Sequence, residues 1–193
     1  QVYIQYTFHM NIRQQITSIQ NQYYNENKKN RIFKKDQKFE CAEYVTKYIN
    51  LDELIENTLY FVTNTNILIC DYTIFKTFMY PEIYPYFNNH FVNMFQYGID
   101  NFEKVNLYIQ SDSFTVSAFE RYRECIQHLI NIIPYGWVEY AETITLFNCP
   151  SMIENILSLL FLLLDKNSKD NLKKKLKIVQ KKDSSTLDSY LKV

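Results

Sequence analysis

The sequence has very little glycine, and this excludes several classes of function. Its 193 residues include two glycines, Gly98 and Gly136, too few for a glycine-rich phosphate loop or a dinucleotide-binding fingerprint. No H-x-E, H-E-x-x-H or G-x-S-x-G motif occurs, and the three histidines are far apart in the sequence. We therefore expect no catalytic residues, no metal site and no cofactor, which is typical of a non-enzymatic protein.

Net charge and long apolar runs are also missing. The 21 basic and 21 acidic residues cancel, so no overall attraction to nucleic acid is expected. The longest mostly apolar run, residues 156–164, is far shorter than the roughly 20 residues that span a bilayer. The four cysteines are widely spaced without a C-x-x-C pair. This pattern predicts free thiols in an intracellular reducing compartment, either the cytoplasm or an organelle such as a mitochondrion.

Hydrophobic and aromatic residues are plentiful, and from residue 66 onward they form a regular pattern. They make up 47% and 17% of the chain, enough for a hydrophobic core. Short apolar runs predict strands at 67–70, 105–109, 144–147 and 176–179. Helical patterns lie between them, the first of which Gly98 is expected to close in a left-handed conformation. This alternation predicts an α/β fold with a mostly parallel sheet flanked by helices.

The first 65 residues are less regular. Residues 1–10 suit a strand and 12–23 suit a helix, and the basic stretch 25–38 is typical of an exposed loop. Residues 41–48 suit a helix, with a strand as the alternative because of their β-branched content. Asn50, with Glu53 three residues later, predicts the N-cap of a further helix. We therefore expect an irregular N-terminal extension over 1–65, of mixed helix and strand, and an α/β domain over 66–193.

The most informative stretch is 144–179. It predicts a strand, an Asn148-Cys149-Pro150 corner, a very apolar helix over 152–164, a lysine-rich helix and a second strand. Pro150 keeps the preceding residue out of the helical conformation, and Ser151 with Glu154 resembles a capping box. The last turns of the apolar helix are apolar on all sides, so it must be buried, cover a cavity, or dock on a partner or membrane.

This order of elements resembles the C-terminal half of CRAL-TRIO lipid-binding domains and of their BCH branch. The resemblance rests on Asn148, Pro150, the helix 152–164, the lysines that follow, and the strand that begins at Lys177 and Ile178. It covers about residues 66–193. One departure is that Asp112 is followed by Ser113 and Phe114, where the family usually has a glycine. The resemblance implies a hydrophobic pocket beneath the apolar helix, with candidate ligand-binding residues Leu107, Ile109, Phe114, Leu146, Phe147, Ile156 and Leu160.

Two functional hypotheses follow. In the first, the protein binds a lipid or other hydrophobic ligand in a pocket covered by the helix 152–164, without catalysis. The lysines Lys173, Lys174, Lys175 and Lys177 would then meet an anionic head group or, by peripheral contact, a membrane surface; the alternative is a solvated helix face. In the second hypothesis, aromatic side chains fill the pocket, and the chain is a ligand-free structural or interaction subunit that docks into a larger protein complex.

Overall fold

A five-stranded sheet organises the protein. The computed structural model describes residues 11–28, 34–134, 136–180, 187 and 189–191. The strands lie in the order β1-β2-β3-β4-β5, and β2 to β5 are parallel, whereas β1 is antiparallel to β2. The prediction of a mostly parallel α/β sheet is therefore confirmed. The strands are β1 (Leu59–Phe61), β2 (Ile67–Asp71), β3 (Val105–Gln110), β4 (Ala141–Cys149) and β5 (Leu176–Gln180).

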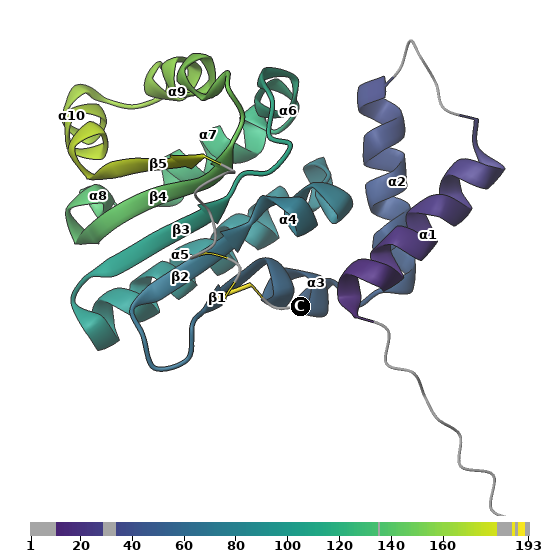
Figure 1. Cartoon of the computed structure of the whole chain (residues 1–193), viewed down its shortest axis with the longest axis horizontal. Coiled ribbons are helices and arrows are strands. Elements are labelled where there is room, and N and C mark those ends of the chain that lie inside the picture. Colours follow the sequence, from purple (N-terminus) through teal and green to yellow (C-terminus); the bar gives the residue numbers. More distant parts are fainter. Residues whose placement is uncertain (1–10, 29–33, 135, 181–186, 188, 192–193) are drawn as a thin grey trace, which may run out of the picture.

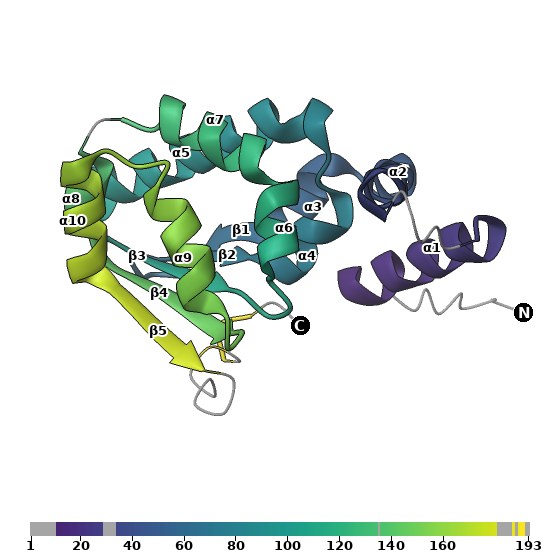
Figure 2. The ribbon, with the colours of Figure 1, turned by 90° about the horizontal axis from the view of Figure 1, so that it is seen from above.

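Helices cover one face of this sheet and extend beyond its β1 side. Figure 2 shows α5, α7 and α9 on one face, with α8 and α10 at one end of that layer. Figure 1 shows α1 and α2 beside α4, on the side of the molecule away from β5. The helices are α1 (Ile12–Glu26), α2 (Lys34–Tyr48), α3 (Leu51–Thr58), α4 (Tyr72–Phe78), α5 (Tyr84–Phe102), α6 (Val116–Arg121), α7 (Arg123–Ile132), α8 (Trp137–Tyr140), α9 (Ile153–Phe161) and α10 (Lys166–Lys175), with a 3-10 turn, η1 (Pro81–Ile83), before α5.

Helix starts follow local capping chemistry only in part. Asn50 caps α3 as predicted, because its side-chain oxygen accepts a hydrogen bond of 2.7 Å from the backbone N–H of Asp52. Thr115 caps α6, Asp165 caps α10, and α9 begins after Met152 without a side-chain cap. The capping box expected at the start of α9 is therefore wrong.

Gly98 does not end a helix. Helix α5 continues through it to Phe102, and Gly98 is buried inside the helix. A Cβ atom at this position would lie 2.6 Å from Cζ of Phe61 and 2.6 Å from Cγ2 of Val105. The prediction of a left-handed closure is wrong, because the glycine serves instead to let α5 approach β1 and β3 closely.

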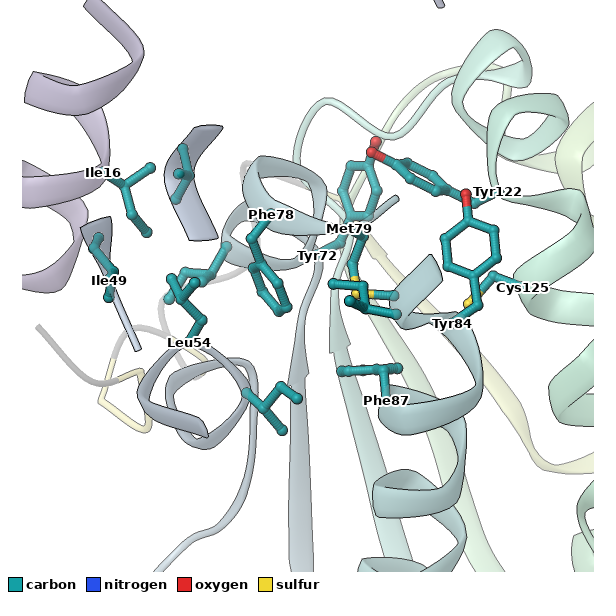
Figure 3. Close-up of a cluster of buried hydrophobic side chains, with 14 of the residues drawn as sticks. Ile16, Ile49, Leu54, Tyr72, Phe78, Met79, Tyr84, Phe87, Tyr122 and Cys125 are labelled. Atoms are coloured by element: carbon teal, nitrogen blue, oxygen red, sulfur yellow. The ribbon is translucent and has the colours of Figure 1, made fainter. Parts of the chain in front are cut away.

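The N-terminal helices share a hydrophobic core with the α/β layer. Figure 3 shows Ile16, Ile49 and Leu54 on one side of this cluster and Tyr84 and Cys125 on the other, with buried side chains of α4 between them. The loop expected over 25–38 is shorter than predicted, because α2 begins at residue 34. The expected strand over 1–10 lies outside the described residues.

Candidate hydrophobic ligand site

Two rows of apolar side chains form the floor of an interior cavity. Strand pairing aligns Leu107, Ile144 and Leu176 across β3, β4 and β5. A second row aligns Cys70, Ile109 and Leu146 across β2, β3 and β4. The two rows are two residues apart along each strand that they share, so their side chains point to the same face of the sheet. All six side chains line the cavity.

The helical layer forms the walls and roof. The cavity has a volume of about 270 Å³ and is lined by residues of the sheet and of helices α5, α7, α9 and α10. Almost all of its surface is carbon and sulfur. The side chains that complete it are Tyr72, Phe75, Phe87, Asn88, Phe91, Ser111, Phe114, Phe119, Tyr122, Cys125, Ile126, Leu129, Ile130, Ile133, Trp137, Ile153, Ile156, Leu157, Leu160, Leu164 and Leu172.

The structure brings most of the candidate ligand-binding residues to this one space. Leu107, Ile109, Phe114, Leu146, Ile156 and Leu160 all line it. Phe147 does not. It lies on the opposite face of the sheet, where it packs against Tyr108 with ring centroids 5.2 Å apart, in a cluster that includes Leu187.

The placement of Phe147 has a simple physical reason. Successive residues in a strand point to opposite faces, so Leu146 and Phe147 cannot both face the cavity. The family resemblance implied that both residues line the pocket, which is wrong for Phe147. Sequence reasoning also missed the contribution of α7, although the apolar face over 119–133 was the signal. That same face supplies Ile126, Leu129 and Ile130 to the wall.

The polar residues of the wall turn their polar atoms away from the cavity. The Asn88 side chain is 1% exposed, and its Nδ2 donates to the backbone oxygen of Cys125 at 2.8 Å and lies 2.9 Å from Nδ1 of His128. The Tyr122 hydroxyl donates to the backbone oxygen of Lys76 at 3.2 Å. The Ser111 hydroxyl lies 3.4 Å from the backbone oxygen of Ile109. These groups are therefore paired within the protein and offer no anchor inside the cavity.

The two thiols of the wall are chemically quiet. Burial raises the pKa of Cys70 and that of Cys125 to about 12. Both thiols are therefore protonated at neutral pH, and a protonated thiol is a poor nucleophile. Across the described part of the chain, no group of three or more His, Cys, Asp or Glu side chains is arranged to hold a metal ion.

Helix α9 covers one side of the cavity with its inner face. Ile156 and Leu157 are 3% and 5% exposed, and Leu160 also lines the cavity. The helix ends at Phe161, earlier than the predicted residue 164, and Leu162 in the following turn is 74% exposed. The apolar residues at this end therefore divide between the cavity and the surface.

The four lysines that were expected to meet a head group differ in whether their ammonium groups are available. Lys173, Lys174 and Lys177 are exposed. Lys175 is not available to a head group, because its Nζ donates to the backbone oxygens of Val138 at 2.6 Å, Glu139 at 3.0 Å and Ala141 at 2.6 Å. Desolvation lowers the pKa of this lysine. Its role is to hold the end of α8 and the start of β4 against α10.

Asn148 and Pro150 form a structural corner. Asn148 has a positive φ of 55°, and the pairing of β4 with β5 shifts register between Phe147 and Cys149. Its Nδ2 donates to Oε1 of Gln110 at 2.8 Å. The corner is thus a β-bulge, which the side chain of Asn148 ties to the end of β3 before Pro150 ends the strand.

Comparison with known proteins supports the fold. No family model matches the sequence, and a sequence search of curated proteins also gives no match. The crystal structure of Sfh5, a Sec14-like CRAL-TRIO protein, is similar, with a TM-score of 0.54 at 18% sequence identity. The match covers 93% of this chain and 63% of the Sfh5 chain. The predicted CRAL-TRIO-like fold is therefore confirmed.

Proposed function

We propose that this protein binds a small hydrophobic ligand in the cavity beneath α9, without catalysis. The observation that carries the proposal is a cavity of about 270 Å³ with a carbon and sulfur wall, between the sheet and its helical layer. Apolar pockets of this kind bind ligands through the hydrophobic effect. Each buried CH₂ group contributes about 0.8 kcal/mol. The fold shared with Sfh5 is consistent with this use.

We further propose that the end of α9 makes peripheral contact with a membrane when ligand is exchanged. Leu162 is 74% exposed, and the neighbouring Phe161 ring has Nζ of Lys169 and Nζ of Lys173 at 5.9 and 5.3 Å from its centroid. An exposed leucine beside lysines suits an anionic bilayer surface, where each cation contributes about 1 kcal/mol. Within the described residues, no helix is long and apolar enough to cross a membrane.

Native mass spectrometry of protein purified from its source tests ligand binding directly. We expect a mass increase that corresponds to one bound small molecule and that disappears on denaturation. A protein that carries no ligand, binds no added lipid and elutes only as part of a larger assembly would contradict the proposal. It would instead support a structural or interaction subunit.

A pair of variants tests whether the cavity is the site. Leu160→Asp places a carboxylate on the cavity wall, so it should abolish ligand retention. Asn155→Asp adds the same charge on the exposed face of the same helix, away from the cavity, and should leave retention unchanged. Circular dichroism should show that both variants keep the helix and strand content of the parent. If Leu160→Asp retained the ligand, this cavity would not be the binding site.

A further inference from the structure

The wall of the cavity contains no charged side chain within the described part of the chain. Three of its polar residues, Asn88, Ser111 and Tyr122, use their polar atoms in contacts within the protein. An ionised group that entered this space would lose its water and find no partner, which is strongly unfavourable. The wall therefore disfavours ionised ligand groups, in addition to favouring apolar ones.

Two cations come close to the cavity without reaching it. Nζ of Lys76 lies 5.7 Å from the ring centroid of Tyr72, and the guanidinium carbon of Arg121 lies 5.7 Å from that of Tyr122. Both tyrosines line the cavity, whereas neither cation does. Lys76 is also hydrogen-bonded to the hydroxyl of Ser113 at 2.5 Å. An anionic head group inside the cavity would therefore be separated from both positive charges.

Both ends of the cavity are apolar. Tyr72 and Phe114 follow the carboxyl ends of β2 and β3, whereas Trp137 and Leu172 precede the amino ends of β4 and β5. Because these strands are parallel, the lining residues extend along the strand direction from one edge of the sheet to the other. Neither end presents the paired donors that recognition of a carboxylate or phosphate requires.

The volume limits the size of the ligand. Pockets for drug-sized ligands begin near about 300 Å³, and this cavity of about 270 Å³ lies just below that range. The space therefore favours one short chain or one ring system over the two acyl chains of a phospholipid.

We propose that the natural ligand is an uncharged molecule with a single chain or ring system, and that ionised single-chain lipids and two-chain phospholipids are discriminated against. This inference rests on the proposed function, and it names the class of ligand for the same cavity. The discrimination arises from an unsolvated, uncharged wall, because an uncharged end costs far less to bury here than an ionised end.

The protein contains its own reporter for a test. Trp137 is the single tryptophan of the chain, and its side chain lines the cavity. Its fluorescence should respond to occupancy without any label. Methyl decanoate and decanoate form the matched pair of probes, because they have the same chain and the same two oxygens and differ in charge and in one methyl group, which accounts for about 0.8 kcal/mol of the difference. Decanol and didecanoyl phosphatidylcholine complete the series.

We expect methyl decanoate and decanol to shift the Trp137 emission saturably at pH 8. We expect decanoate to bind at least tenfold more weakly, a difference of about 1.4 kcal/mol or more, and the phospholipid to cause no saturable change. Leu160→Asp should weaken binding of methyl decanoate at least tenfold, whereas Asn155→Asp, on the exposed face of α9, should not.

The outcomes distinguish a wrong ligand class from a wrong proposed function. Equal affinity for decanoate and its ester, or tight binding of the phospholipid, would overturn the inference about ligand class and leave hydrophobic binding intact. If no probe changed the fluorescence and none was retained in native mass spectrometry, the proposed function itself would fall.

Discussion

Substitution of Cys70 by isoleucine should raise stability and lower ligand affinity at the same time. Cys70 lies on β2 and faces the cavity in the same row as Ile109 and Leu146. Isoleucine replaces the sulfur with carbon and adds two further carbons, which would enter empty space. At about 0.8 kcal/mol for each buried carbon, the free energy of unfolding should rise by about 1.6 kcal/mol. A β-branched side chain also suits a strand.

Urea denaturation of the ligand-free protein measures this change, and thermal denaturation should show a Tm increase of about 3–6 °C. Titration with methyl decanoate, followed through Trp137, should show weaker binding because the added carbons occupy ligand volume. Cys41→Ile is the matched control. Cys41 lies on α2, is 2% exposed and does not line the cavity, so the same carbons should overpack the core and cost about 1–3 kcal/mol.

Two results would refute this reasoning. If Cys70→Ile destabilised the protein as much as Cys41→Ile does, no usable space would exist beside Cys70. If it stabilised the protein and left ligand affinity unchanged, the space would exist but would not be where ligand binds.

Four further predictions concern stability. Gly98→Ala should lower the free energy of unfolding by up to about 2 kcal/mol in urea denaturation, because overpacking against Phe61 and Val105 costs about 1–3 kcal/mol and the helix-propensity gain returns about 1 kcal/mol. Arg13→Met should cost about 3 kcal/mol by the same measurement, because it leaves the carboxylate of Asp71, 1% exposed, without its cation; Asp71→Asn added to it should recover part of the loss. Lys175→Met should cost about 2 kcal/mol, since it removes charge-assisted hydrogen bonds to three backbone oxygens, and a loss below 0.5 kcal/mol, within the range of about 0.5 kcal/mol for ordinary surface changes, would contradict it. The pKa of each cavity thiol is raised from 9.0 to about 12, so their contribution to stability is present below pH 9 and should be lost as the pH rises from 9 to 12; replacing both thiols by valine should flatten this alkaline decline.

Strands were easier to predict than the elements that tertiary packing decides. The apolar runs that begin at residues 67, 105, 144 and 176 all became parallel strands, because a buried strand needs a short apolar run between polar residues. Helix α4 was missed. Its sequence, YTIFKTF, is rich in aromatic and β-branched residues and has the local preferences of a strand. Packing against α2 and α3, together with the Asp71 cap, overrides that preference.

The site was predictable as a region but not atom by atom. The sequence placed an apolar helix over a sheet, and α9 does cover the cavity. It did not reveal that Lys175 is drawn to three backbone oxygens while its neighbours remain exposed. That outcome depends on α8, a four-residue helix, which is too short for periodicity to detect.

The remaining question from the sequence was whether aromatic rings fill the pocket, and the position of each ring answers it. Four rings gather near the carboxyl ends of β2 and β3 and pack on one another, with Tyr72 and Phe114 centroids 4.7 Å apart and those of Phe75 and Tyr122 5.1 Å apart, whereas the Trp137 ring lies at the other end. The floor of the cavity carries aliphatic side chains and a thiol instead. Because edge-to-face contacts hold the rings to one another, they close one end of the cavity and leave its middle open. Ile109→Phe, which would place a ring on the floor, should therefore close the space and abolish the response of Trp137 to methyl decanoate while the protein remains folded.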